Sequence, residues 1–216
     1  MKFARSVGFL IGAFALVVSV ATAQPSTAKT YAFVPHAAFF SLEAKLPNLL
    51  DPQAFVSDAS SVAAIGPQKI AHVGGVRPAF GVDDPRTEIV NANGQALHLS
   101  LAKWFGAYGA VTLTAGPATT EASFTFAGLV PGGHYSLFEN HFSDAGVTFT
   151  PADGTGTANS FTASATGAAA VKLRVPGTVT HGEALLLVYH SDGFEHGMER
   201  GQIGVVAHHQ LIMRVP

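Results

Sequence analysis

Histidine is concentrated at the end of this chain, where imidazole could bind a metal ion or carry a proton. Half of the ten histidines lie in the last 36 residues. Imidazole nitrogen is a common ligand of zinc and copper, and carboxylates often complete such sites. In the stretch YHSDGFEHGMERGQIGVVAHHQL, three such side chains fall within seven residues and a fourth follows in the next expected strand. The candidate ligands of copper or zinc are His190, Asp192, His196 and His208.

The strands on either side of this loop limit which histidines can share a site. We expect them to pair as an antiparallel hairpin with His190 opposite Ile203, in which each further residue adds ~3.3 Å. His208 and His209 then lie ~15–20 Å from His190, so one site cannot use both ends of the hairpin. A site confined to the loop, or a different register, avoids this conflict.

Alternation along the last strand assigns its two histidines to different faces. His209 shares a phase with Leu211 and Met213, which predicts a core histidine bonded through one ring nitrogen. His208 lies in the more polar phase, which predicts a half-exposed side chain. The histidines outside this region, His36 among them, stand alone in the sequence and are interpreted as structural or surface residues.

Other catalytic arrangements have weaker support in the sequence. It contains no G-x-S-x-G, H-E-x-x-H, phosphate-binding glycine loop or EF-hand loop. His190, Ser191 and Asp192 are adjacent, and neighbours in a strand point to opposite faces, so they do not suit a converging triad. Asp192, Glu195 and Glu199 share one glycine-rich loop, which is more typical of solvated carboxylates than of a glycosidase pair. A hydrolase with a site of another kind stays open as an alternative.

The elements that would position these residues are mainly β-strands. From residue 109 onward, strand-like segments recur about every ten residues and are separated by Gly, Pro or Asp turns. In EASFTFAGL, for example, Ala122, Phe124 and Phe126 fall on one face. The pattern predicts a mainly β fold, an antiparallel β-sandwich of the Ig-like or cupredoxin-like type with about eight strands.

One or two short helices accompany these strands. The first is expected over residues 37–45 and ends before Pro47. Ser100 could cap the second, in which apolar residues follow at helical spacing. Its Trp104, the only tryptophan, is expected to be a core anchor because large aromatic side chains dominate core burial.

The first 23 residues have the pattern of a signal peptide. Lys2 and Arg5 precede an apolar run over 8–20, and Ala21-Thr22-Ala23 resembles a signal-peptidase site. The apolar run is short for a membrane-spanning helix, so we expect cleavage after Ala23 and no stable transmembrane segment afterwards. A twin-arginine motif is absent, which favours the general secretory route to the periplasm or the extracellular medium.

The remaining chain divides by composition into two parts. Residues 24–85 predict an irregular N-terminal extension with a short helix and one or two strands, packed on a β-sandwich domain over 86–216. Removing the signal peptide changes the formal charge from −2 to −4, which does not suit a nucleic-acid surface. Cysteine is absent, which excludes disulfides, thiol catalysis, iron–sulfur clusters and cysteine-ligated blue copper.

The second part resembles a group of exported prokaryotic β-sandwich domains that have no established activity. The similarity rests on GLVPGGHYSLF, on DGTGTANSF and on the closing YHSDG…HG…G…IGVVAHHQL, and it covers about half the chain. It implies the fold and the export but transfers no catalytic residue. A looser similarity to cupredoxin-like sandwiches does not imply electron transfer, because the copper-ligating cysteine is missing. Met198 and Met213 could serve only in a different copper site.

Taken together, these features predict an exported, non-enzymatic β-sandwich protein of the binding or envelope-structural type. No cofactor is expected, and the partner would be a small ligand, a metal ion or an envelope protein rather than nucleic acid. The alternative is a periplasmic copper- or zinc-binding protein that uses the C-terminal loop histidines.

Overall fold

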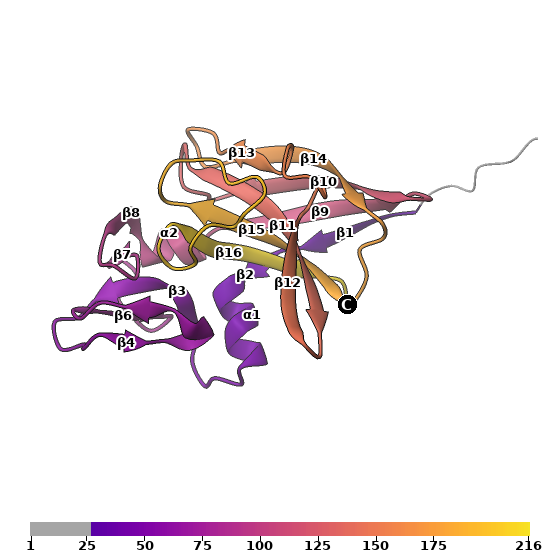
Figure 1. Cartoon of the computed structure of the whole chain (residues 1–216). Helices are drawn as coiled ribbons and strands as arrows, with labels where there is room; N and C mark the ends of the chain where they lie inside the picture. Colours follow the sequence, from indigo (N-terminus) through magenta and orange to yellow (C-terminus); the bar gives the residue numbers. More distant parts are fainter. Residues whose placement is uncertain (1–26) are drawn as a thin grey trace, which may run out of the picture.

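Two antiparallel sheets face each other in the computed structural model, which describes residues 27–216 (Figure 1). The four-stranded sheet has the order β1 (Ala28–Ala32), β9 (Tyr108–Ala115), β10 (Thr119–Ala127) and β14 (Ala169–Pro176). The six-stranded sheet has the order β12 (Gly146–Pro151), β11 (His134–Ser143), β15 (Glu183–His190), β16 (Ala207–Arg214) and β2 (Val34–Pro35), with β13 (Ser160–Thr162) also paired to β11. The predicted antiparallel sandwich is confirmed, and the expected strands after residue 109 correspond to β9–β16.

The main core fills the space between these sheets. Along β10 every second residue is buried, and Ala122, Phe124 and Phe126 form the buried face, as their alternation predicts. The six-stranded sheet contributes Leu187 and Tyr135 to the same core. Period-two burial of this kind explains why the sequence pattern identified the strands.

Both predicted helices are present and short. α1 spans His36–Glu43, and α2 spans Leu101–Phe105. The hydroxyl of Ser100 accepts a hydrogen bond from the backbone N–H of Lys103 at 3.4 Å, which caps α2. Trp104 is 2% exposed and is a core residue, as expected.

A third sheet lies beside the sandwich. Its order is β6 (Val76–Phe80), β3 (Leu50–Ser57), β7 (Glu88–Val90) and β8 (Ala96–Ser100), and nearby lie β4 (Ala64–Ile65), the 3₁₀ turn η1 (Pro67–Lys69) and β5 (Ala71–His72). The segment expected to be an irregular extension therefore contains more strands than predicted. The first strand of this segment, β1, belongs to the sandwich. The third sheet contains strands from both sides of residue 85.

The pairing of β15 with β16 differs from the expected hairpin. His190 pairs with Ala207, not with Ile203, because residues 204–206 form a turn and Ile203 makes only an isolated bridge to Ala207. His208 consequently lies opposite Tyr189, next to His190 in the hairpin, so the predicted separation of ~15–20 Å was wrong.

A β-bulge in β16 also breaks the expected alternation. Leu187 pairs with Leu211 and Val188 pairs with His209, which leaves Gln210 as the extra residue. His209 therefore points away from the main core that holds Leu211, toward the outer face of the six-stranded sheet. The prediction of a buried His209 is confirmed, but its expected face was wrong.

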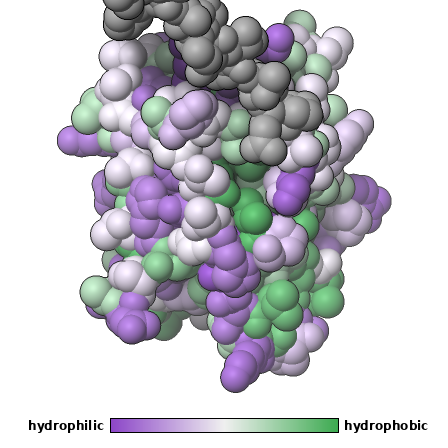
Figure 2. All heavy atoms as spheres, turned by 90° about the vertical axis from the view of Figure 1, so that its right-hand side faces the viewer, coloured by the Kyte–Doolittle hydropathy of each residue, from purple (hydrophilic) through white to green (hydrophobic). Residues whose placement is uncertain are grey.

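α1 covers part of this outer face. A small second core joins the sheet residues to Phe39 of α1 and to Phe142 and Phe149 of the β11–β12 hairpin. Figure 2 shows this side of the molecule, where hydrophobic residues gather in the lower part of the view and hydrophilic residues surround them. Within residues 27–216 no helix is long and apolar enough to cross a membrane. The predicted signal peptide, 1–23, lies outside the described residues.

Candidate ligand-binding pocket

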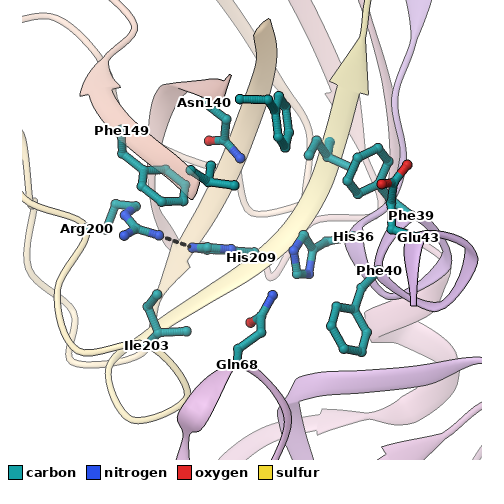
Figure 3. Close-up of a pocket in the computed structure, with 13 residues that line it drawn as sticks. His36, Phe39, Phe40, Glu43, Gln68, Asn140, Phe149, Arg200, Ile203 and His209 are labelled. Carbon is teal, nitrogen blue, oxygen red and sulfur yellow. Dashed lines mark hydrogen bonds between the residues drawn. The ribbon is translucent and has the colours of Figure 1, made fainter. Parts of the chain in front are cut away.

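A cavity of about 390 Å³ opens on the outer face of the six-stranded sheet (Figure 3). Its walls come from α1, the β11–β12 hairpin, β16 and the loop that precedes β16. Aromatic rings form much of the apolar wall: Phe39, Phe40, Phe142 and Phe149. Polar side chains lie among them: His36, Gln68, Asn140, Arg200 and His209, with Glu43 at the exposed end of α1.

Backbone geometry brings these side chains together from distant segments. The pleat of β11 turns Asn140 and Phe142 to the same face of the sheet. The bulge in β16 turns His209 to that face as well. His36 begins α1 directly after Pro35, and its ring meets the His209 ring edge-to-face at 4.9 Å.

The buried amide of Gln53 holds the ring of His209 in place. Its Oε1 accepts a hydrogen bond from the backbone N–H of His209 at 2.8 Å, and a backbone N–H can only donate. The amide orientation is thereby fixed, and its Nε2 donates to Oε1 of Gln68 at 2.6 Å and lies 3.0 Å from Nδ1 of His209. The other ring nitrogen of His209, Nε2, faces Arg200.

Arg200 meets this Nε2 atom across the pocket. Its Nη1 lies 3.2 Å from Nε2 of His209, and its guanidinium carbon lies 3.1 Å from the centre of the Phe149 ring. Burial lowers the pKa of Arg200 to about 10, so the guanidinium is still charged at neutral pH. Arginine can only donate, so this contact is a hydrogen bond from the guanidinium to Nε2 (Figure 3), and the other N–H groups of the guanidinium have no hydrogen-bonding partner among residues 27–216.

The two histidines of the pocket are held neutral. Burial, and secondarily the charge of Arg200, lowers the pKa of His36 to about 4. Burial, followed by the nearby His36 and Arg200, lowers the pKa of His209 well below its usual value. The pocket therefore combines one positive charge with neutral imidazole donors and acceptors.

Two polar atoms of the pocket residues have no hydrogen-bonding partner among residues 27–216. They are Nδ1 of His36 and Oδ1 of Asn140, and both are buried. Leaving a buried polar atom unpaired costs ~1–3 kcal/mol. Such atoms are expected where a ligand or ordered water completes the hydrogen bonds.

Three of the four sequence-predicted metal ligands lie near one another, but their ligand atoms do not converge within 4.8 Å as those of Glu139, His141 and Glu183 do. The rings of His190 and His196 stack with 4.6 Å between their centroids. Nε2 of His196 lies 2.9 Å from Oδ2 of Asp192, and Nε2 of His190 lies 2.9 Å from Oγ of Ser136. Nδ1 of His190 is buried without a partner among the described residues.

His208 is placed differently from the other three. It is fully buried, so the prediction of a half-exposed side chain was wrong. Its Nδ1 donates to the backbone carbonyl of Gln53 at 3.0 Å, and its Nε2 lies 3.2 Å from the hydroxyl of Ser191. Both ring nitrogens thus have protein partners, and burial lowers the pKa of His208 to about 4. Metal binding by the four residues stays a prediction.

Sequence reasoning did not find the pocket. Arg200 was not a candidate, His36 was interpreted as an isolated histidine, and Gln53 lies in a segment that was expected to be largely irregular. No local pattern joins these residues, because α1, β3 and the loop before β16 meet only in the folded chain.

Comparisons of this chain with protein-family models, with curated proteins and with solved structures found no match. The function proposed for this chain therefore rests on the chemistry of the pocket.

Proposed function

We propose that this chain is an exported, non-enzymatic binding protein whose outer pocket holds a small organic carboxylate. The ligand's carboxylate would bind the guanidinium of Arg200 beside His209, and its apolar part would lie against the phenylalanine rings. The observation that carries the proposal is the guanidinium of Arg200, which lines the pocket and has no carboxylate partner among residues 27–216.

Charge and shape support this ligand class. Hydrogen bonds to a charged group contribute ~1.5–3 kcal/mol each, and arginine matches the fork of a carboxylate. Small-molecule sites are commonly concave, largely apolar and ~300–1,000 Å³ in volume, with a few polar groups that fix orientation. The cavity of about 390 Å³, with four phenylalanines and one half-buried arginine, agrees with that description.

Calorimetric titration with matched acids and amides tests the proposal. Octanoate and 3-phenylpropionate should each bind more tightly than octanamide and 3-phenylpropanamide, by at least ~tenfold, because only the acids neutralise the guanidinium. Arg200→Gln should lower the affinity for the acids to the affinity for the amides. Arg174→Gln is the matched control, because Arg174 is an exposed residue of the four-stranded sheet.

Equal affinities for acids and amides would contradict the carboxylate assignment. The absence of any binding at millimolar ligand would contradict the function of the pocket. If Arg200→Gln binds the acids as tightly as the wild type does, the acids bind at another site.

Export is a separate part of the proposal and has its own test. The protein should appear in the periplasmic or extracellular fraction of its host, and its mature N-terminus should be Gln24. N-terminal sequencing of the purified protein measures this directly. A mature chain that begins at Met1 would contradict signal-peptide cleavage.

Binding of copper or zinc by the loop histidines is a second candidate function. The stacked pair of His190 and His196, with an unpaired Nδ1 on His190, favours it. Untagged protein loaded with either metal should then retain about one equivalent, and His196→Ala should abolish binding, because a site depends on all its ligands. Retention below about 0.1 equivalent would exclude this candidate.

A further inference from the structure

Three metal-ligating side chains meet at one end of the sandwich, away from the pocket and from the loop histidines. They are Glu139 and His141 of β11 and Glu183, the first residue of β15. One ligand atom from each lies within 4.8 Å of the others. Among residues 27–216, these are the His, Asp or Glu side chains whose ligand atoms converge in a group of three.

Strand register explains why the three side chains converge. His141 pairs directly with Glu183 across the β11–β15 ladder, and Glu139 lies two residues away on the same face of β11. This face also carries Leu137 and Leu185, which belong to the main core. The pocket uses the opposite face of β11, so the two sites are separated by the sheet itself.

Glu139 is the unusual member of the group. Its side chain is more than nine-tenths buried, and no described residue donates a hydrogen bond to its carboxylate. The nearest basic atom is Nε2 of His141 at 3.9 Å, which is too long for a hydrogen bond. Burial and the adjacent Glu183 raise the pKa of Glu139 to about 7. A buried carboxylate beside a second carboxylate is costly unless a cation compensates their charge.

The other two side chains are oriented by hydroxyl groups. The backbone N–H and the hydroxyl of Thr180 donate to Oε2 of Glu183 at 2.5 and 2.8 Å, which leaves Oε1 without those bonds. Nε2 of His141 lies 2.8 Å from the hydroxyl of Thr150. The bonds from Thr180 orient Glu183 as supporting bonds orient ligands in metal sites, whereas Nε2 of His141 would exchange its bond to Thr150 for the ion. His141 and Glu183 are partly exposed, so an ion can enter from solvent.

We propose that Glu139, His141 and Glu183 bind a Zn²⁺ ion, with water completing its coordination. The inference does not depend on the function proposed for the pocket. Zinc is bound by imidazole and carboxylate at about 2.0–2.2 Å, and three ligands with an open position are typical of accessible zinc sites. The two carboxylates balance its charge, and the absence of sulfur ligands disfavours copper(I). Rotation of the three side chains brings their ligand atoms from the present spacing of up to 4.8 Å to bonding distance from one ion.

The test is zinc titration of the untagged, chelator-treated mature chain. Wild-type protein should bind one equivalent of Zn²⁺ at this site, and Co²⁺ in its place should give a d–d absorption spectrum. Glu139→Gln and His141→Ala should each weaken zinc binding by more than the ~10–100-fold that loss of a supporting residue causes. Glu121→Gln, which changes an exposed carboxylate of the four-stranded sheet, is the matched control and should bind zinc like the wild type.

Further variants separate this site from the two other proposals. Arg200→Gln should leave zinc binding unchanged, and Glu139→Gln should leave octanoate binding unchanged. Glu139→Gln removes a buried charge, so the metal-free variant should unfold at the same temperature as metal-free wild type or at a higher one. This unfolding transition shows that the variant is folded. Zinc binding that survives Glu139→Gln and His141→Ala, or that is lost in His196→Ala alone, would overturn the proposal.

Discussion

Gln53 joins β3 to β16 and controls how His209 faces the pocket. Its side-chain amide is fully buried and bonds to the backbone N–H and to Nδ1 of His209. A single amide therefore fixes the orientation of the imidazole. The hydrogen bond between Arg200 and Nε2 of His209 depends on this orientation as much as on Arg200 itself.

Gln53→Leu should destabilise the protein and weaken octanoate binding. The change leaves the backbone N–H and Nδ1 of His209 unpaired, and such losses cost ~1–3 kcal/mol each. Urea unfolding and calorimetry measure the two effects. Gln202→Leu, at an exposed position of the loop, should change stability by less than ~0.5 kcal/mol. Unchanged stability in Gln53→Leu would contradict the proposed role of the amide.

Buried histidines make stability depend on pH. The pKa values of His36 and His208 fall to about 4, and that of His209 is also lowered, each mainly because of burial. The unfolded chain therefore binds more protons than the folded chain between pH ~6.5 and 4. Stability is fully present above pH ~6.5 and should fall as the pH drops, by up to ~1.4 kcal/mol per pH unit for each histidine.

Glu139 acts in the opposite direction in metal-free protein, because its raised pKa favours proton uptake by the folded state below pH ~7. Burial also raises the pKa of Asp51, but these two groups do not outweigh four histidines, because burial lowers the pKa of His190 to about 4 as well. Urea midpoints at pH 7.5, 6.0 and 5.0 in the presence of chelator should decrease in that order. A midpoint that is constant or rises toward pH 5.0 would show that these histidines are not held neutral.

At the scale of elements, α1 depends on packing rather than on its own helix signals. It has eight residues, no side-chain N-cap bond and no acidic residue in its first turn. Isolated helices of this length are marginal in water. Phe39, which packs against the second core, supplies the missing stabilisation and a wall of the pocket.

Phe39→Ala should lower the free energy of unfolding by ~1–3 kcal/mol, less than a fully buried phenylalanine would cost, because the ring is half-buried. It should also weaken octanoate binding. Leu42→Ala on the same helix is the matched control, since Leu42 is 77% exposed, and its effect should stay within ~0.5 kcal/mol. Equal effects of the two changes in urea unfolding would contradict the packing described for α1.

At the scale of the whole molecule, Asp51 ties the third sheet to the sandwich. Its Oδ1 accepts hydrogen bonds from the backbone N–H groups of Gln53 and Ala54, and its Oδ2 accepts one from Nε1 of Trp104 at 2.7 Å. Burial raises the pKa of Asp51, and these three hydrogen bonds oppose the rise. Trp104 also contributes to the main core, so the contact couples two sheets through one carboxylate.

Asp51→Asn should destabilise the protein by ~1–3 kcal/mol although it keeps the shape of the side chain. An amide has one acceptor oxygen, so at least one of the three donors would face an NH₂ group. Fluorescence of Trp104, the only tryptophan, should report the change in urea unfolding. Glu88→Gln, at an exposed position of the third sheet, is the control. Unchanged stability of Asp51→Asn would contradict the coupling.

Strands β9–β16, both helices and the core tryptophan were predictable from the sequence because each depends on neighbouring residues. Period-two burial identified β9–β16, and Ser100 identified the start of α2. The export signal is likewise a local pattern, and it stays a prediction because it lies outside the described residues.

The sites depend on register and on packing between distant segments, which local patterns do not encode. One extra residue, Gln210, reverses the face of His209, because a one-residue shift moves side chains to the other side of a sheet. Glu139 and His141 share a face in any strand, but only the pairing of β11 with β15 adds Glu183. The sequence alone therefore determined the sandwich, and the tertiary structure decided which polar side chains meet.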